Sequence, residues 1–382
     1  MPWVLPHEWS GPEVSYLVSK SVLSRLAALR LTPSSPAESS GRVAVAPLMG
    51  WTHRHFRYLL RCVSPSVVLF TEMIPSAALV HGRKTQSLLS YHSCEHPIAL
   101  QLAGDCPDQL ANAARIGHEY GYDEINLNVG CPSPRVQRGG FGVCLMAQPE
   151  RLAECVRAIR SVNPVPVTIK CRLGFDEHHS DHFLDDFVAI LSEAGCSTFY
   201  VHARMAWLQG LDPKENREKP PLNYSRVDRL KKKFKDLEII LNGGIRDLEQ
   251  VVELLSRFDG VMVGRRVLED PLWLAEVDQR LGRASRDIRT REAVVLAYVD
   301  YLRKILRDPG LPGQGRRSPS LFQPLGGLFR SFPGAAKMRA EAARASQAAP
   351  SELLGWLDRL EKWAEAGSSH LAPGHPYRVS DV

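Results

Sequence analysis

The sequence predicts an α/β fold, a (β/α)8 TIM barrel followed by a small C-terminal helical domain. Three observations support this prediction. After residue 42, short apolar segments alternate with segments in which Leu, Ala, Val and Ile recur every three or four residues. Apolar strands that alternate with helices in this way are typical of a parallel sheet covered by helices. The alternation continues through eight units and stops near residue 286, after which only helical patterns follow.

The eight predicted strands lie between residues 43 and 266. They are VAVAPL (43–48), VVLFTEM (67–73), PIALQLA (97–103), EINLNVG (124–130), VPVTIKCRLG (165–174), STFYVHAR (197–204), LEIILNGG (237–244) and GVMVGRR (260–266). Eight strand–helix units in about 240 residues match the size of a barrel of this kind. A doubly wound dinucleotide-binding sheet would instead carry G-x-G-x-x-G after its first strand, but the sequence there reads PLMGWTHRHF.

We divide the 382 residues into four parts. These are an N-terminal extension (1–42), the barrel (43–285), a helical domain (286–368) and a tail (369–382). In the extension, VSYLVSKSVLSRLAALRL (14–31) is basic, rich in serine and free of acidic residues. Two interpretations stay open: a plastid or mitochondrial targeting segment, which Glu8 and Glu13 weaken, and a disordered extension of a cytoplasmic protein.

The composition is that of an ordinary globular protein, with 44% hydrophobic and 24% charged residues. No apolar run approaches the roughly 20 residues that a membrane span needs. The eight cysteines are scattered and no two form C-x-x-C, which argues against a zinc site and a disulfide framework. We therefore expect a reducing compartment, no metal, no membrane and a monomer. The net charge of +6 permits a nucleic-acid partner without establishing one.

Polar residues interrupt several of the apolar runs at their C-terminal ends, where the active site of such a barrel forms. The candidates are Gln101, Asn128, Cys131, Lys170, His202, Asn242 and Arg265. A single residue of this kind is commonly structural. Seven on one rim would each need a buried partner, so a functional site is the better explanation.

The last two runs end in NGG (242–244) and GR (264–265), the usual place for a phosphate in this fold. Gly243 and Gly244 allow backbone N–H groups to approach a phosphate, and Arg265 can add charge-assisted hydrogen bonds. A cofactor with one phosphate fits, and FMN also offers an electron-rich ring for Lys170. Pyridoxal phosphate, with Lys170 as its Schiff-base amine, is the rival, but it gives Cys131 no role.

The chain resembles the tRNA-dihydrouridine synthases, and among them the tRNA-dihydrouridine(20/20a) synthase subgroup. The resemblance covers residues 43 to about 340 and rests on VAPLMGWTHRHFRYLLR, LFTEM, the long stretch that contains NLNVGCPSPRVQRGGFGVCLM, VTIKCRLG, VHARMAWLQGLDPKENREKPPL, NGGIRDLEQ and DGVMVGRRVLEDP. It implies an oxidoreductase that uses FMN and NADPH to reduce the C5=C6 bond of a D-loop uridine (position 20/20a) in tRNA. The residues that it implies for FMN are Pro47, Leu48, Met49, Gln101, Lys170, His202, Asn242, Gly243, Gly244, Gly264 and Arg265.

The resemblance also makes Cys131 the catalytic acid and places Asn128, Lys214 and Arg217 near the tRNA. Reduction of uracil adds hydride at C6, which reduced FMN would supply, and a proton at C5. A thiol with an ordinary pKa near about 8.5 is mostly protonated at neutral pH and can donate that proton. Cys144 is then a packed residue or a second acid. We expect Lys170 or His202, as a cation, to stabilise charge on the uracil oxygens.

The target base must leave its stack to be reduced, and its flanking phosphates need cations. We expect Arg135, Arg138, Lys214 and Arg217 to provide them, although simple loop solubility explains the first two as well. Further basic residues are expected on the surface of the helical domain: Arg316, Arg317, Arg330, Lys337 and Arg339.

One stretch departs from the family pattern. Where the family has His-Met-Leu-Gly-Leu-Phe and then Pro-Gly-Ala-Arg, this chain reads QPLGGLFRSFPGAAKMRA (323–340). Two rival functions also stay open. One is an FMN barrel that reduces a small enone or pyrimidine, and the other is a tRNA-binding protein that has lost catalysis.

Overall fold

The computed structural model describes residues 41–283, 289–307, 319–330, 332, 334–348 and 350–369. Residues 1–40 of the N-terminal extension, Arg316, Arg317 and the predicted domain boundary near residue 285 lie outside these residues, whereas Arg42 already belongs to the first strand. Within the described ranges, no helix has the length and apolar character needed to cross a membrane.

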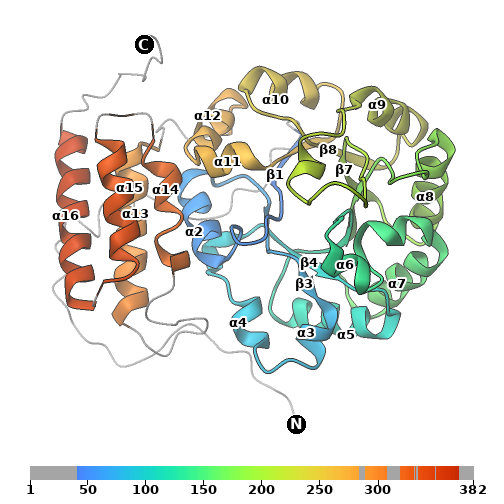
Figure 1. Ribbon diagram of the computed structural model, residues 1–382, viewed down its shortest axis with the longest axis horizontal. Coiled ribbons are helices and arrows are strands. Elements are labelled where there is room, and N and C mark those ends of the chain that lie inside the picture. The colour runs from blue at the N-terminus through green and yellow to red at the C-terminus, as the bar shows by residue number, and fades with distance from the viewer. Residues whose placement is uncertain are drawn as a thin grey trace. The chain divides into compact units, whose positions relative to one another are not determined.

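The strands form one parallel sheet that curves into a barrel (Figure 1). Its order is β1-β9-β8-β7-β6-β5-β4-β2, and a parallel bridge between Ala44 and Val68 brings the two ends together. The predicted barrel of eight parallel strand positions is thus confirmed. The strands are β1 (Arg42–Val45), β2 (Leu69–Phe70), β3 (Ile74–Pro75), β4 (Ile98–Ala103), β5 (Glu124–Val129), β6 (Val167–Arg172), β7 (Thr198–His202), β8 (Glu238–Asn242) and β9 (Gly260–Val263).

The second strand is shorter than the predicted 67–73 and is split in two. Both β2 and β3 pair with β4. Between them, the N–H of Gln101 donates to the hydroxyl of Thr71 at 3.0 Å instead of to a backbone carbonyl. The side chain of Thr71 therefore interrupts the ladder, and Pro75, which has no N–H, ends the second piece.

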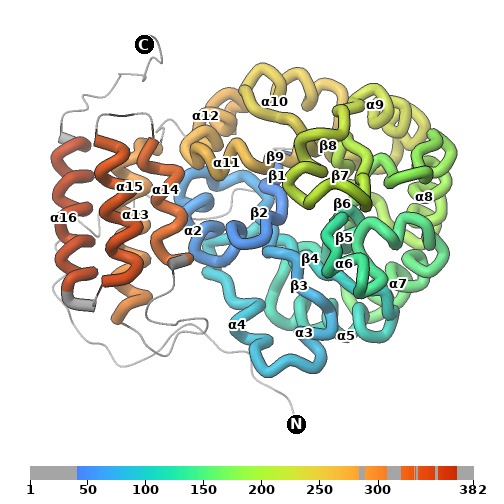
Figure 2. The backbone as a smooth tube through the Cα atoms, in the orientation of Figure 1, coloured from blue at the N-terminus to red at the C-terminus, as the bar shows by residue number. Residues whose placement is uncertain are grey.

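Helices follow the strands and cover the outside of the barrel (Figure 2). α5 and α7 each begin with proline, whose missing N–H costs nothing at the first helical position. Side-chain caps begin others: the carboxylate of Asp247 accepts the N–H of Gln250 at 2.8 Å. The barrel helices are α2 (Arg54–Val63), α3 (Ser76–Val80), α4 (Thr85–Leu89), α5 (Pro107–Glu119), α6 (Pro134–Arg138), α7 (Pro149–Val162), α8 (Asp181–Glu193), α9 (Tyr224–Lys233), α10 (Leu248–Leu255), α11 (Arg265–Glu269) and α12 (Trp273–Arg280).

The chain ends in further helices, and four short 3₁₀ turns lie along it. The helices are α13 (Arg291–Arg307), α14 (Leu325–Leu328), α15 (Ala335–Ala345) and α16 (Pro350–Ser369). The turns are η1 (Ser93–Glu95), η2 (Gly142–Ala147), η3 (Glu215–Arg217) and η4 (Pro319–Leu321).

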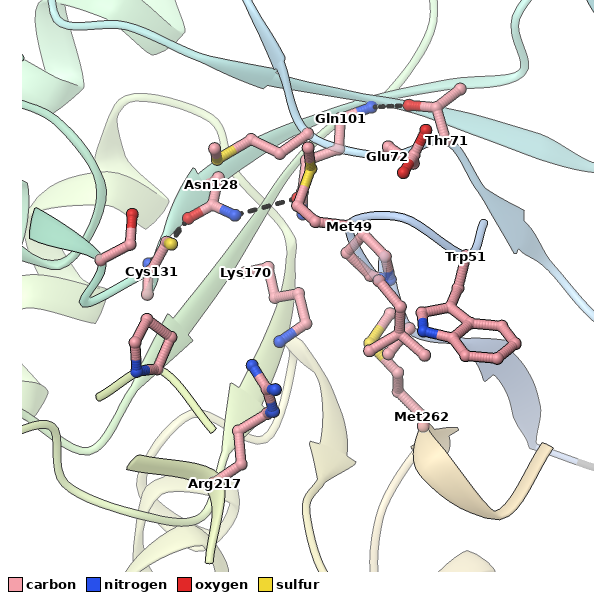
Figure 3. A pocket seen from close by; sticks show the side chains of 18 of the residues that line it. Met49, Trp51, Thr71, Glu72, Gln101, Asn128, Cys131, Lys170, Arg217 and Met262 are labelled. Atoms are coloured by element: carbon pink, nitrogen blue, oxygen red, sulfur yellow. Dashed lines mark hydrogen bonds between the residues drawn. The ribbon is translucent and has the colours of Figure 1, made fainter. Parts of the chain in front are cut away.

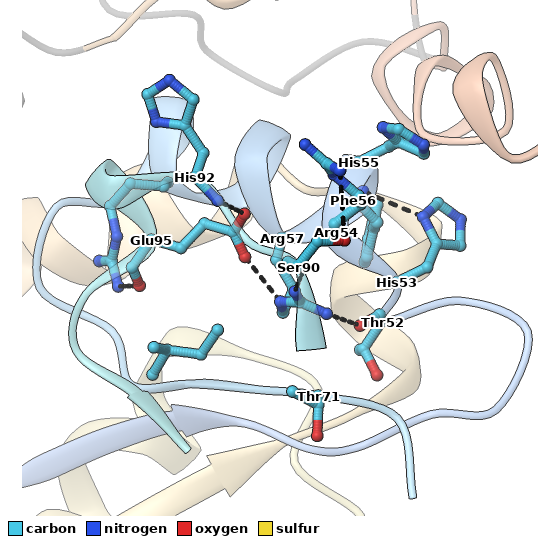
Figure 4. Close-up of polar contacts among 12 residues, drawn as sticks. Thr52, His53, Arg54, His55, Phe56, Arg57, Thr71, Ser90, His92 and Glu95 are labelled. Carbon is cyan, nitrogen blue, oxygen red and sulfur yellow. Dashed lines mark hydrogen bonds and ion pairs between the residues drawn. The ribbon is translucent and has the colours of Figure 1, made fainter. Parts of the chain in front are cut away.

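Helix α2 joins the barrel to the C-terminal helices. Nδ1 of His55 and the hydroxyl of Tyr301 lie 2.7 Å apart, and the ring of Tyr58 stacks on Tyr301 with centroids 3.9 Å apart. On its other side α2 carries Arg57, which is buried and pairs with Glu95 at 2.7 Å (Figure 4). Arg57 also donates to the carbonyl of Thr52 at 2.8 Å, so this ion pair holds the loop that follows β1.

Candidate active site

A cavity of about 1000 Å³ opens at the C-terminal ends of the strands. Every site residue predicted from the sequence lines it except Arg138, which is exposed at the end of α6. Cys144, the alternative acid, also does not line the cavity, and burial raises the pKa of its thiol. The predicted residues in the lining are Pro47, Leu48, Met49, Gln101, Asn128, Cys131, Arg135, Lys170, His202, Lys214, Arg217, Asn242, Gly243, Gly244, Gly264 and Arg265.

The register of the sheet explains why these residues meet. Asn128 on β5 lies beside Lys170 on β6, and Arg172 on β6 lies beside His202 on β7. His202 in turn pairs with Asn242 at the end of β8. Because all strands are parallel, their C-terminal residues converge on one rim.

The turn that carries Cys131 is fixed by the side chain of Asn128. Its Oδ1 accepts the N–H of Gly130 at 3.2 Å and the N–H of Cys131 at 3.0 Å. Figure 3 shows Asn128 between Cys131 and Gln101. With Oδ1 committed to these two donors, Nδ2 of Asn128 donates to Oε1 of Gln101 at 2.9 Å. The amide orientation at the rim is therefore set.

A buried chain of hydrogen bonds continues from Gln101 into the barrel. Gln101 donates to Oδ1 of Asn126 at 2.8 Å, and Asn126 donates to the hydroxyl of Thr168 at 2.8 Å. Thr168 donates to Glu124 at 2.6 Å. Glu124 also accepts from Tyr200, at 3.2 Å. Each link donates in the same direction, so the carboxylate at one end and the two backbone N–H groups on Asn128 at the other favour the same orientation of the amides.

Lys170 lies in the cavity between Asn128 and Asn242. Its Nζ donates to Oδ1 of Asn242 at 3.2 Å, and Nδ2 of Asn242 donates to the carbonyl of Met262 at 2.7 Å. Burial, reinforced by the charge of Arg172, lowers the pKa of Lys170 to about 8. Lys170 is thus a cation in most molecules at neutral pH, and it loses its proton under mildly basic conditions.

The sequence offered Lys170 or His202 as the cation that stabilises charge on the uracil oxygens. His202 is not that cation. Its imidazole is buried, and burial together with the charges of Arg172 and Lys170 lowers its pKa well below the ordinary value. At neutral pH His202 is therefore neutral. It can donate or accept a hydrogen bond, and Lys170 is left as the cation of the pair.

The NGG segment has the backbone that the phosphate prediction requires. Gly243 and Gly244 have φ values of 109° and 76°. A Cβ would come within 2.5 Å of the His202 ring at the first position and within 2.4 Å of Leu222 at the second. Only glycine suits both positions. Nearby, the guanidinium of Arg265 pairs with Glu218 and donates to the carbonyl of Arg217 at 3.1 Å.

Comparison with known proteins decides the family. The family described as dihydrouridine synthase (Dus) matches residues 44–360. The chain belongs to the dihydrouridine synthase family. This confirms the resemblance seen in the sequence and identifies the chain as an oxidoreductase of that family.

Three relatives of the family are similar over most of their length, and each is named tRNA-dihydrouridine(20/20a) synthase. The protein of Shewanella oneidensis is 48% identical over 78% of this chain and 86% of its own. The protein of Vibrio vulnificus is 47% identical, over 78% and 90% respectively. That of Escherichia coli K12 is 46% identical, over 78% and 85%.

Among solved structures, morphinone reductase in complex with tetrahydroNAD is 16% identical and has a TM-score of 0.44. The match covers 67% of this chain and 92% of that chain. At this level the similarity does not bear on function.

Two buried residues that the sequence did not single out hold the backbone around the site. Arg172 is buried and bonds three backbone carbonyls: Gly130 at 2.9 Å, Met205 at 2.9 Å and Asn216 at 3.0 Å. Burial lowers its pKa to about 10. The second residue, Asn216, is fully buried in the loop that carries Lys214 and Arg217. Arg172 stands in KCRLG (170–174) and Asn216 in KENRE (214–218), and both stretches belong to the segments that carry the family resemblance.

The basic residues of the loop differ in their surroundings. Lys214 is exposed, whereas Arg217 is half-buried and points toward Lys170 in Figure 3. In the described part of the chain, Nε of Arg217 is buried without a hydrogen-bond partner. In the C-terminal helices, Arg330, Lys337 and Arg339 are exposed, as expected for a basic surface.

Proposed function

We propose that this chain reduces the C5=C6 bond of a D-loop uridine in tRNA to 5,6-dihydrouridine, with FMN as its bound cofactor and NADPH as the reductant. One observation carries the proposal: Cys131, Lys170 and the glycines of the NGG segment surround a single cavity in a member of the dihydrouridine synthase family. Relatives at 46–48% identity are named for positions 20 and 20a. This supports one or both of these positions as the target.

The residues present fit FMN. Gly243 and Gly244 form a cradle that any Cβ would fill, so backbone N–H groups can approach a phosphate there. Arg265, beside the cradle, supplies a guanidinium that can exchange Glu218 for phosphate oxygens. Pro47, Leu48, Met49 and Gln101 line the same cavity, which at about 1000 Å³ is large for one cofactor. The remaining space suits a nucleotide of the substrate.

When bound, FMN reduced by NADPH supplies the hydride that is added at C6. The protein supplies the rest. The thiol of Cys131 donates a proton to C5. Asn128 holds the turn that carries Cys131, so the thiol keeps its position relative to the cavity. Lys170, cationic at neutral pH, stabilises negative charge that develops on the uracil oxygens. Neutral His202 contributes a hydrogen bond and no charge.

The tRNA meets the same rim. Arg135, Lys214 and Arg217 line the cavity and give cations for the phosphates that flank an extruded base. Asn128 keeps one N–H of its amide free of the contacts described above, so it can donate to a carbonyl of the base. Arg138 faces solvent instead and fits a contact farther along the backbone.

Purified protein tests the proposal directly. It is expected to be yellow, to release FMN on denaturation and to form dihydrouridine in unmodified tRNA when NADPH is supplied. A flavin-free protein that cannot be reconstituted would contradict the cofactor. A flavoprotein that oxidises NADPH but leaves tRNA unchanged would contradict the substrate, and reduction of small enones in its place would support the rival. Mapping of dihydrouridine in tRNA from a strain that lacks the gene identifies the position.

A further inference from the structure

The loop between β7 and α9, part of which lines the cavity, exposes a large aromatic side chain. Trp207 is 50% exposed, and no other tryptophan among the described residues is as exposed. Trp273 and Trp356, in contrast, are buried. Trp207 does not line the cavity, but it belongs to the same loop as Lys214 and Arg217, which do.

The backbone at Trp207 is tied to Asn216 on both sides. Oδ1 of Asn216 accepts the N–H of Trp207 at 2.7 Å, and its Nδ2 donates to the carbonyl of Trp207 at 2.8 Å. The same Nδ2 lies 3.2 Å from the carbonyls of Leu211 and Asp212. Asn216 is fully buried, so these bonds are made away from water. The asparagine of the KENRE motif therefore serves the loop rather than the cavity.

Two further contacts brace this loop, one from the end of β6 and one from the segment that follows β6. The carboxylate of Asp176 accepts the N–H of Leu208 at 2.9 Å, and Asp176 itself has a φ of 43°. A non-glycine residue adopts this region rarely and persists there where its surroundings hold it. Arg172 donates to the carbonyl of Met205 at 2.9 Å. The residues on either side of Trp207 are thus fixed, while its indole stays in water.

This combination holds the indole in one place where a partner can reach it. An exposed tryptophan contributes little to a core, and a fixed backbone adds nothing to solubility. A rigid aromatic loses few degrees of freedom when a ring stacks on it, which is why such side chains serve as anchors in recognition. Stacking on an aromatic side chain is also the general way in which proteins hold unpaired nucleobases.

The charges around Trp207 favour RNA as the partner. The acidic residues of the loop are already engaged: Glu215 pairs with Lys219 at 2.6 Å, and Glu218 pairs with Arg265. Asp212 accepts the backbone N–H of Lys214 at 2.7 Å. The side chain of Lys214 makes no ion pair in the ranges that the structure describes. A cation without an ion pair and an exposed indole on one loop are the groups expected to bind a nucleotide and its phosphate.

We propose that Trp207 is the stacking platform for a nucleobase of tRNA next to the target uridine, and that Asn216 is the positioning residue that holds this platform. The inference rests on the proposed function, because it names the part of tRNA that the loop contacts. It assigns stacking to Trp207 and charge to Lys214, and these two contributions respond differently to salt.

The experiment measures the Kd of a fluorescently labelled, unmodified tRNA transcript for the flavin-loaded chain across a salt series. Trp207→Ala is expected to raise Kd about 5- to 150-fold, while Trp207→Phe stays within about threefold of the native chain. The slope of log Kd against log salt stays unchanged in Trp207→Ala, because no phosphate contact is lost. Lys214→Ala is expected to reduce that slope by about 0.7 to 0.9.

Leu354→Ala serves as the matched control, since Leu354 is a 38% exposed apolar residue on α16. Its Kd and slope should equal those of the native chain. Asn216→Ala is expected to raise Kd less in the Trp207→Ala background than in the native one, because the platform that it holds is already gone. Bound flavin per chain, measured for each variant, shows that the barrel is folded.

Three results would overturn the inference while leaving the proposed function intact. These are a Kd for Trp207→Ala within twofold of native, a loss of affinity that comes with a reduced salt slope, and a change of oligomeric state that makes Trp207 a contact between copies. If the native chain neither binds nor reduces tRNA, the proposed function fails and the inference falls with it.

Discussion

Nε of Arg172 donates to the carbonyl oxygen of Gly130 at 2.9 Å, one residue before Cys131. The same guanidinium reaches the carbonyl of Asn216 at 3.0 Å on the loop of Lys214 and Arg217. A single buried cation therefore sets the distance between the proposed acid and the proposed tRNA-binding loop. Neither contact touches the cavity contents directly, but both fix groups that do.

Arg172→Lys is expected to lower the rate of dihydrouridine formation about 100-fold while FMN stays bound. Lysine keeps the charge but lacks the planar fork that bonds several carbonyls at once, and small displacements of reacting groups cost rates of this order. Arg151→Lys is the control, because Arg151 is largely exposed on α7. Equal rates in the two variants would show that Arg172 does not position the site.

Cys131→Ala is expected to bind FMN as the native chain does and to form dihydrouridine about 100- to 10,000-fold more slowly. The reason is loss of the proton donor while the bonds from Asn128 to the turn remain. Cys144→Ala, away from the cavity, should keep its activity. If the Cys131 variant turned over normally and the Cys144 variant did not, the acid would have to be reassigned. Rates come from single-turnover assays on tRNA.

The location of the site was predictable because its polar residues stand out within apolar stretches of the sequence. Gln101, Asn128, Lys170 and Asn242 each break an apolar strand at its C-terminal end, and parallel strands bring those ends together. What was missed depends on partners far away in the chain. Arg172 bonds Gly130 and Asn216, about forty residues before and after it, and no spacing reveals such a pair.

The prediction that His202 could be a cation was wrong for a related reason. The sequence shows a histidine at a rim position but not that it is buried beside Arg172 and Lys170, which together make the imidazolium unfavourable. The split of the second strand was hidden as well, because it depends on the hydroxyl of Thr71 replacing a backbone acceptor. In both cases a local pattern was overridden by tertiary contacts.

The rate of dihydrouridine formation is expected to fall as pH rises through about 8. The pKa of Lys170 is lowered to about 8, so its cationic form prevails below that pH and is lost above it. In Lys170→Arg, which stays cationic, the part of this decline that Lys170 causes should be absent. The test is a pH series of single-turnover rates for both proteins. A decline at the same pH in the arginine variant would assign it to another group.

Stability is expected to fall on mild acidification, and His55 contributes to this. Burial lowers its pKa to about 2, so the folded state does not take up a proton where the unfolded state does. The sign follows from linkage: the contribution is complete above pH 6.5 and is lost as pH falls below it, by up to about 1.4 kcal/mol per pH unit.

His55→Asn should flatten that dependence while leaving a polar partner for the hydroxyl of Tyr301. The measurement is the free energy of unfolding in urea between pH 7.5 and 5. His182→Asn, at an exposed position of α8, is the matched control. A slope in the His55 variant equal to that of the native chain would exclude this histidine as a source of acid lability.

Thr168→Val tests whether the buried chain of hydrogen bonds sets the amides of the site. The substitution removes the acceptor of Asn126 and one donor to Glu124, at 2.8 and 2.6 Å. With that link lost, only the N–H groups of Gly130 and Cys131 still hold the amide of Asn128, and the turn of Cys131 is held less firmly. We expect the variant to lose about 1–3 kcal/mol of unfolding free energy, because a buried group is left unsatisfied. In the protein that remains folded, we expect the rate of dihydrouridine formation to fall about tenfold. Thr168→Ser, which keeps the hydroxyl, should restore the rate.

The control for this variant is Thr198→Val. Thr198 is also buried and also donates to a carboxylate, that of Glu238 at 2.8 Å. It joins the chain only beyond the Glu124 end, through Arg42, which pairs with both carboxylates. Its variant should lose stability without loss of turnover. If the two valine variants showed equal rates at equal losses of stability, the chain would be structural only. Because every link donates toward Glu124, a selective loss at Thr168 would mean that a carboxylate deep in the barrel orients the residue that holds the proton donor.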